Sequence, residues 1–284
     1  LLIRSPEGWG EAHFADWLAH RLLELPFPEF EEVASESTED GALNVAGRML
    51  AHADLRWVEP DGAVIKVDDI RMLADFAIGT RQSAPRKVAV IEKAHLLNAN
   101  AANALLKTLE EPPPHTHLLL ATAQPGRLLP TIVSRCQSLV IGADAAVARQ
   151  WLLERWAAQA VDARLFEYGN APLSCDAALR DGEEPLLPVL AGMATSDQPT
   201  QAVEGLLALD PDRLLSRWYR HCIALAAGQI DEPWAAEVSS RRMRGFVDEL
   251  VRTRRQMLYT NSANARLLLE RLSVSWRSMC ASGT

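Results

Sequence analysis

A turn near the N-terminus has the position of a phosphate-binding loop but lacks the side chains that such a loop needs. The active pattern is GxxxxGK[ST], in which glycines let backbone amides wrap the phosphates, lysine neutralises charge and the hydroxyl holds Mg²⁺. Gly8 and Gly10 are present, whereas Ser5 replaces the first glycine, Glu11 replaces the lysine and Ala12 carries no hydroxyl. A carboxylate about 4 Å from a phosphate charge repels it by roughly 4 kcal/mol at an effective dielectric constant of 20. We therefore expect an empty turn, in which Glu11 stabilises a helix N-terminus as an anion does.

A second degenerate pattern follows the apolar run at residues 88–91, where a Walker B strand would end. Hydrolysis needs one acid there to help hold Mg²⁺ and a second carboxylate to polarise water. Glu92 could serve as the first acid, but Lys93 occupies the second position and cannot act as a carboxylate base. Two catalytic requirements thus fail together, and we interpret both residues as ordinary polar residues at a strand end.

The composition is that of an ordinary globular protein and argues against several classes of function. The chain has 284 residues, 48% of them hydrophobic, and a net charge of −8. No apolar run approaches the roughly 18 residues that a membrane-spanning helix needs. The acidic total argues against autonomous DNA binding, which a strong basic bias drives. The first residues lack the features of a secretory signal and do not begin with Met, so we expect a cytoplasmic protein whose native N-terminus lies further upstream.

The histidines and cysteines do not predict a metal site. The four cysteines lie far apart without a CxxC pair, and the seven histidines show no HExxH pattern. This spacing fits neither a zinc ribbon nor a disulfide framework. We expect reduced thiols that are mostly buried, as is usual in the cytosol.

Segments typical of strands and of helices alternate from residue 1 to about residue 143. Strand-like runs lie at residues 1–4, 87–91, 117–123 and 138–141, and helix-like runs at 11–25, 98–111 and 130–134. This alternation predicts an α/β domain, with a mostly parallel sheet and helices on both faces. Residues 29–40 are acidic and predict a solvated loop. After Gly142 only helical spacing is found, which predicts a smaller all-α domain at 144–194 and a larger one at 195–284.

Two strings carry more information than composition or spacing. Residues 102–113 read ANALLKTLEEPP and residues 130–136 read PTIVSRC. Together they closely resemble the clamp-loader family of AAA+ proteins of bacterial DNA polymerase III, in which NALLKxLEEPP followed by TIxSRC is highly specific. The strong similarity covers about residues 87–138, and weaker similarity reaches both ends of the chain. The resemblance implies an AAA+ P-loop-like domain at 1–143, a helical lid at 144–194 and a helical collar for oligomerisation at 195–284.

The resemblance also implies a role for the SRC motif, which here is Ser134, Arg135 and Cys136. In clamp loaders this motif presents an arginine finger to the ATP bound by a neighbouring subunit. Such fingers stabilise charge on the phosphoryl oxygens and are worth about 10³ to 10⁵ in rate. By this likeness Arg135 is the finger, and the chain is similar to the loader subunit that keeps SRC but has lost its own ATPase site.

The partners and cofactors implied by this resemblance follow from the family. The chain would take one place in a five-subunit arc around primer-template DNA, beside gamma or tau motor subunits and a delta subunit, with the sliding clamp as an indirect partner. ATP and Mg²⁺ would be bound by the neighbour, so the chain is not expected to be an enzyme on its own. Many relatives carry a four-cysteine zinc module, but residues 26–51 contain no cysteine, and no zinc is predicted. Two hypotheses stay open: an AAA+ ATPase with an atypical P-loop, and a free-standing DNA-binding protein.

Overall fold

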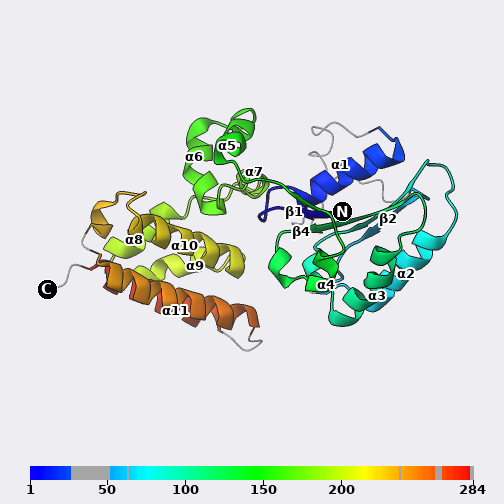
Figure 1. The fold of residues 1–284 in the computed structure, drawn as a ribbon. Coiled ribbons are helices and arrows are strands. Elements are labelled where there is room, and N and C mark those ends of the chain that lie inside the picture. Colours follow the sequence, from blue (N-terminus) through cyan, green and yellow to red (C-terminus); the bar gives the residue numbers. More distant parts are fainter. Residues whose placement is uncertain (27–51, 63, 237, 260–263, 282–284) are drawn as a thin grey trace. The chain divides into compact units, whose positions relative to one another are not determined.

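The computed structural model describes residues 1–26, 52–62, 64–236, 238–259 and 264–281. The chain divides into two compact units, residues 1–145 and residues 146–284, and each is described by itself (Figure 1). The expected loop at 29–40 lies outside the described residues, as does nearly all of the cysteine-free segment 26–51. The division into three domains stays a prediction, because the second unit holds both predicted helical domains.

The N-terminal unit is built on a five-stranded parallel sheet in the order β2-β3-β4-β1-β5. Its strands are β1 (Leu2–Arg4), β2 (Leu55–Val58), β3 (Lys87–Ile91), β4 (Thr116–Thr122) and β5 (Ser138–Val140). Leu2 of β1 pairs with Leu120 on one side and with Ser138 on the other. The predicted parallel sheet is confirmed, and β2 is a strand that the sequence analysis did not identify.

Helices cover both faces of this sheet, as predicted. Helix α1 (Glu11–Leu23) packs on one face, whereas α2 (Val67–Ile78) and α3 (Ala99–Glu110) pack on the other (Figure 1). The strand β3 shows why two faces are needed, because its side chains alternate between the two cores. Val88 and Val90 belong to the core under α1, while Ala89 and Ile91 belong to the core under α2 and α3.

Local signals set the ends of α3. The side chain of Asn98 accepts a hydrogen bond from the Ala101 N–H at 2.8 Å, as an N-cap residue does. The helix ends at Glu110, two residues before Pro112, which supplies no amide for another turn. The short helix α4 (Pro130–Val133) then leads to β5, with its proline in the first turn as predicted.

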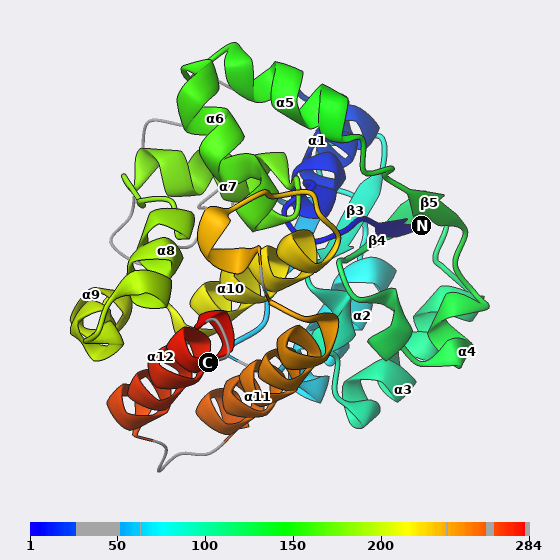
Figure 2. The same ribbon diagram turned by 90° about the vertical axis from the view of Figure 1, so that its left-hand side faces the viewer.

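The regular secondary structure in the described part of the C-terminal unit is entirely helical. The helices are α5 (Ala145–Leu153), which starts at the unit boundary, α6 (Ala158–Arg164), α7 (Pro172–Arg180), α8 (Leu187–Thr195), α9 (Val203–Leu206), α10 (Pro211–Ala226), α11 (Ser240–Tyr259) and α12 (Ala265–Cys280), with short 3-10 turns between some of them. Figure 2 shows α11 and α12 side by side, and α10 packs against α11. Their shared core is centred on Trp218 and Trp276, whose rings meet edge to face at 5.7 Å. The indole of Trp276 donates to the Leu190 carbonyl of α8 at 2.9 Å, which ties α8 to the same core.

Helical spacing in the sequence predicts one apolar stripe made of Phe246, Val247, Leu250, Val251 and Leu258, which lie in α11, and this prediction is partly wrong. Phe246 and Leu250 are buried as expected, but the side chains of Val251 and Leu258 are exposed. Val251 follows Leu250 by about 100° around the helix axis, which turns it away from the core. The buried positions instead begin one turn earlier, at Met243.

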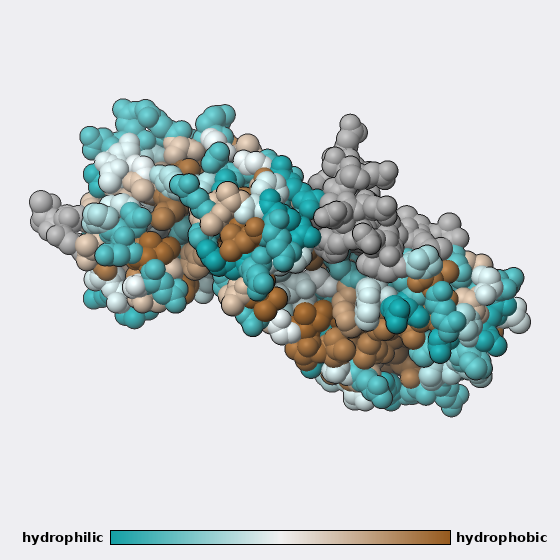
Figure 3. Space-filling model, turned by 90° about the horizontal axis from the view of Figure 1, so that it is seen from above, coloured by the Kyte–Doolittle hydropathy of each residue, from teal (hydrophilic) through white to brown (hydrophobic). Residues whose placement is uncertain are grey.

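The surface and the thiols agree with a folded globular protein. Apolar residues reach the surface in places (brown in Figure 3), and the most exposed large ones include Ile78, Val140 and Leu267. No helix in the described part of the chain is long and apolar enough to cross a membrane. All four cysteines are free thiols; three are buried and Cys136 is half-buried, which confirms the prediction of mostly buried thiols.

Candidate functional site

The residues of the predicted nucleotide site lie together at the carboxyl edge of the sheet, where its parallel strands end. Strands β1, β3 and β4 run parallel and therefore end at the same side of the sheet. The turn at residues 5–10 follows β1, Glu92 and Lys93 follow β3, and Thr122 ends β4. Ligands of open parallel sheets bind at this carboxyl edge. The structure thus places the degenerate residues where a nucleotide site of this fold would lie.

The turn after β1 is closed by a hydrogen bond between two of its predicted residues. The hydroxyl of Ser5, which is buried, lies 2.5 Å from Oε2 of Glu11, to which it donates. Gly8 and Gly10 have φ values of 77° and 91°, a region that glycine enters without steric cost. Ala12 follows in the first turn of α1 and adds no polar group. The carboxylate that replaces the lysine is therefore already bound within the turn.

The edge carries negative charge where a triphosphate needs positive charge. Burial raises the pKa of Glu11; the Ser5 hydrogen bond opposes this, and the nearby carboxylates of Glu92 and Glu7 raise the pKa further. Glu92 has a partner of its own, because the Trp57 indole donates to its Oε2 at 3.3 Å. Lys93 has an exposed side chain and a left-handed backbone with φ of 48°. The Glu92 carboxylate thus lies near enough to Glu11 to raise the pKa of Glu11, whereas the Lys93 side chain is exposed to solvent.

Arg135 lies toward the amino edge of the sheet, where the parallel strands begin. It precedes β5, whose first residue, Ser138, is paired with Leu2 at the start of β1. The Leu2 N–H donates to the carbonyl of Gln137 at 2.7 Å, which fixes this register. From Leu2 to Ser5 the strand covers about 10 Å at roughly 3.3 Å per residue. Arg135 is therefore separated from its own nucleotide turn by the length of β1.

The guanidinium of Arg135 is held by the end of α3 and by α4. Its Nε and Nη2 atoms lie 2.6 and 2.5 Å from Oε1 of Glu110. Its Nη1 donates to the carbonyl of Thr131 at 3.0 Å. The pair is solvent-accessible, with 35% of the Arg135 side chain and 49% of the Glu110 side chain exposed. The side chain is thus ordered yet open to a partner.

The other two residues of the SRC motif support this arrangement. The Ser134 hydroxyl donates to the Thr131 carbonyl at 3.1 Å and so closes the end of α4. Cys136 packs against the core beneath α3, and burial raises the pKa of its thiol. A raised pKa keeps the thiol protonated at neutral pH, so Cys136 acts as a packing residue rather than a nucleophile.

The sequence does not predict the contact between Glu110 and Arg135, although Glu110 lies in the string at residues 102–113. The contact with Arg135 spans 25 residues, and no local pattern predicts it. Nor does the sequence predict the contact of His95, whose Nδ1 lies 2.9 Å from the Thr122 hydroxyl at the carboxyl edge.

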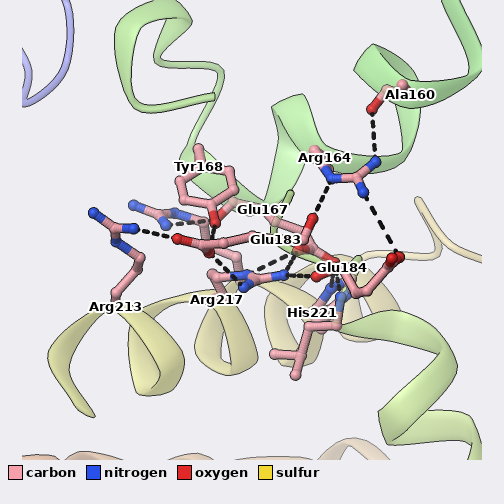
Figure 4. Close-up of polar contacts among 11 residues, drawn as sticks. Ala160, Arg164, Glu167, Tyr168, Glu183, Glu184, Arg213, Arg217 and His221 are labelled. Carbon is pink, nitrogen blue, oxygen red and sulfur yellow. Dashed lines mark hydrogen bonds and ion pairs between the residues drawn. The ribbon is translucent and has the colours of Figure 1, made fainter. Parts of the chain in front are cut away.

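A buried ionic network in the C-terminal unit was not predicted either (Figure 4). The Glu167 carboxylate is fully buried and accepts from Nε and Nη2 of Arg217 at 2.8 and 2.5 Å. It also accepts from the Leu186 N–H at 2.7 Å and lies 2.9 Å from Nε2 of His221. Arg217 reaches the Glu183 carboxylate at 3.1 Å. The spacing of Arg217 and His221, four apart on one helix, was the available signal that both face the same neighbour.

Within the described residues no group of three or more histidine, cysteine or acidic side chains is placed to hold a metal ion. The absence of zinc was predicted for residues 26–51, which lie almost wholly outside the described part. It stays a prediction.

A five-stranded parallel sheet in the order β2-β3-β4-β1-β5, with helices on both faces and a turn after β1 at its carboxyl edge, is the fold of an AAA+ domain. A solved structure agrees with this fold: a gamma-subunit-related protein of DNA polymerase III from Thermotoga maritima superposes with a TM-score of 0.56 and covers 99% of this chain and 94% of that one. At 18% identity this similarity concerns the fold alone.

Sequence comparisons identify the family. The family model described as "DNA polymerase III, delta subunit" matches residues 1–144. The DNA polymerase III subunit delta′ of Pseudomonas aeruginosa is 32% identical over 99% of this chain and 92% of its own length. The tau subunit of Escherichia coli is 48% identical over 25% of this chain and 11% of its own length. The chain belongs to the family of DNA polymerase III delta′ subunits.

Proposed function

We propose that this chain is a clamp-loader subunit that binds no nucleotide itself and supplies Arg135 in trans to the ATP site of a neighbouring subunit. The observation that carries the proposal is the separation of the two sites within the N-terminal unit. A closed, acidic turn lies at the carboxyl edge of the sheet, and an accessible arginine lies toward the other edge. The two sites therefore cannot serve the same nucleotide.

Electrostatics and hydrogen bonding support the loss of nucleotide binding. A triphosphate at the turn would have to displace the Ser5–Glu11 hydrogen bond and lie beside Glu11 and Glu92. Each carboxylate within about 4 Å of a phosphate charge costs roughly 4 kcal/mol at an effective dielectric constant of 20. The lysine that normally offsets such charge is missing, and Lys93 is exposed. We infer that ATP and Mg²⁺ are bound by the neighbour and not by this chain.

The accessibility of Arg135 supports its role as a finger. A guanidinium carries five N–H donors, and the hydrogen bonds to Glu110 and Thr131 use three of them. Nη1 also donates to the Ser134 hydroxyl at 3.5 Å, so these contacts leave one N–H on Nη2 for a phosphate oxygen, and a second oxygen would replace the long Ser134 contact. The relatives of this chain include subunits named tau and gamma, and we propose that a subunit of this kind provides the nucleotide. The sliding clamp and primer-template DNA are then indirect partners.

The proposal is tested by Arg135→Ala in a reconstituted loader. We expect the complex to assemble, and hydrolysis at the neighbouring site to fall by about 10³ or more when DNA is present. Arg135→Lys should restore little, because lysine keeps the charge but loses the planar fork. Arg71→Ala is a matched control, since Arg71 is exposed and pairs with Asp68 at 2.9 Å in the same unit. Unchanged hydrolysis in the Arg135→Ala complex would refute the finger.

Titration calorimetry on the isolated chain tests the closed turn separately. We expect no binding of Mg²⁺-ATP at micromolar concentrations. Micromolar affinity would instead favour an AAA+ ATPase that uses an atypical P-loop. Salt-dependent binding of duplex DNA by the isolated chain would favour an autonomous DNA-binding protein.

A further inference from the structure

We infer that Glu110 is a positioning residue for the Arg135 finger, an inference that rests on the function proposed above. Glu110 is the last residue of α3, and its Oε1 atom receives both Nε and Nη2 of Arg135. Nothing in the residue pattern alone assigns it a role. The inference comes from which edge of the guanidinium it binds.

Glu110 binds the Nε–Nη2 edge of the guanidinium and does not use the donors of Nη1. The Nε–Nη2 edge lies against Glu110 at 2.6 and 2.5 Å, and Nη1 donates to the Thr131 carbonyl at 3.0 Å. Nη1 also donates to the Ser134 hydroxyl at 3.5 Å, which leaves the second N–H of Nη2. A phosphate oxygen can bind this N–H, and another can replace the long Ser134 contact of Nη1, while the contact with Glu110 persists. Glu110 thus orients Arg135 without competing for the donors that a phosphate needs.

Rigid elements support both residues. Helix α3 is fixed by Ala101, Ala102 and Leu105, and α4 is fixed by Ile132; all four are buried in the same apolar core. An arginine on such a support would still sample many rotamers if only its backbone were fixed. The carboxylate removes that freedom before the neighbour's nucleotide arrives, and pre-organised geometry of this kind raises the rate of the chemical step.

The pair contributes little to folding, which makes its role separable from stability. Both side chains are exposed to a substantial extent, at 35% and 49%, and exposed ion pairs stabilise proteins only weakly. A purely structural pair would therefore change nothing measurable when removed. A positioning pair would change the turnover number of the neighbouring site while leaving assembly and nucleotide affinity intact.

The test compares Glu110→Gln with Glu111→Gln in the assembled loader. Glu111 is the next residue and is also exposed, so it matches Glu110 in charge and position. We expect Glu110→Gln to lower kcat for DNA-stimulated ATP hydrolysis by about 10-fold to 100-fold, with KM for ATP changed less than twofold. Glu110→Asp, which keeps the carboxylate, should recover part of the loss. Glu111→Gln should match the unmodified complex, and thermal unfolding should be the same in all variants.

Three outcomes overturn the inference. An unchanged kcat in Glu110→Gln would show that Arg135 needs no such support. A raised kcat would show that Glu110 restrains the finger rather than aims it. If Arg135→Ala itself has no effect, the proposed function fails and the inference fails with it; if Arg135→Ala acts and Glu110→Gln does not, only the inference fails. The combined Arg135→Ala and Glu110→Gln change should lose no more activity than Arg135→Ala alone.

Discussion

Removing Arg217 should destabilise the C-terminal unit more than removing any exposed arginine. Arg217 is 1% exposed and joins α10 to Glu167 and Glu183, which lie 50 and 34 residues away. The Arg217→Met substitution keeps a side chain of useful apolar volume but removes the charge. Glu167 is then a fully buried carboxylate whose partners within the described part of the chain are the Leu186 amide and His221 (Figure 4).

The expected cost follows from leaving a buried charge without its counter-ion. Breaking a buried ion pair by removing one partner costs about 3–5 kcal/mol, because the remaining charge is desolvated and unpaired. Whole domains are stable by only about 5–15 kcal/mol, so this loss is about a fifth or more of the free energy of unfolding. Arg254→Met is the matched control: Arg254 binds Asp212 at 2.5 Å, but the two side chains are 44% and 45% exposed. Its loss should cost at most about 1 kcal/mol.

The loss of stability in Arg217→Met should also depend on pH. Burial raises the pKa of Glu167, but the hydrogen bond from His221 and the charge of Arg217 outweigh burial and hold that pKa below its ordinary value of 4.5. A pKa lowered by folding stabilises the protein above the ordinary value, and this stabilisation is lost as pH falls. Without Arg217 the pKa of Glu167 rises. The difference in stability between Arg217→Met and the unmodified chain should therefore be largest near neutral pH and shrink below about pH 4.5.

Urea unfolding followed by circular dichroism at several pH values measures both effects. A double-mutant cycle with Glu167→Gln should give a coupling of about 2–3 kcal/mol between the two side chains. Equal losses for Arg217→Met and Arg254→Met would refute the reasoning, because burial would then make no difference. A loss that is independent of pH would show that the titration of Glu167 is not involved.

Three further predictions concern other groups. Burial raises the pKa of Asp54, but amides of Ala84, Ser83 and Gln82 outweigh it and hold the pKa at about 2, so stability should fall between about pH 4 and pH 2, and Asp54→Asn should flatten this fall in acid unfolding curves. The sequence predicts a stabilising Glu11 anion at the start of α1, but burial raises the pKa of Glu11, so its ionisation costs stability as pH rises, and Glu11→Gln should raise the urea midpoint at pH 7 but not at pH 3. In native protein a thiol reagent should modify half-buried Cys136 well before the three buried cysteines, and equal rates would contradict the described packing.

The parts of the fold that could be predicted are those that depend on neighbours in sequence. The continuous apolar run at 88–91 predicts a strand that is covered on both faces, and all four of these residues are buried in β3. Strand β2 was not predicted because only Val58 of its four residues is buried. Arg56 also interrupts the sequence, so β2 has no continuous apolar run. Exposure of Val251 was missed for a related reason, since adjacent apolar residues on a helix face different directions.

In the candidate site, too, features that depend on single residues could be predicted from the sequence, whereas contacts between distant residues could not. The proposed failure of the nucleotide turn rests on single residues, as with Glu11 in the place of lysine, and it stays a prediction. The Ser5–Glu11 hydrogen bond and the approach of Glu92 could not be predicted, because they depend on how the turn folds and on which strands are neighbours. The contact of Arg135 with Glu110 depends on α3 and α4 meeting above one core. Long-range charge pairs of this kind have no local pattern.

Under the function proposed above, the distance between the two sites allows the nucleotide site to be lost while the Arg135 site is kept. Exposed charges interact weakly beyond about 8–10 Å at physiological salt. The turn that holds Glu11 and the segment that holds Arg135 lie at different edges of the sheet, separated by at least the roughly 10 Å of β1. Replacing a lysine by Glu11 therefore changes the potential at one edge only, and the donors of Arg135 keep their geometry through Glu110 and Thr131. A subunit of this fold can lose its own nucleotide site and still serve the site of a neighbour, because the two tasks share a scaffold but no charges.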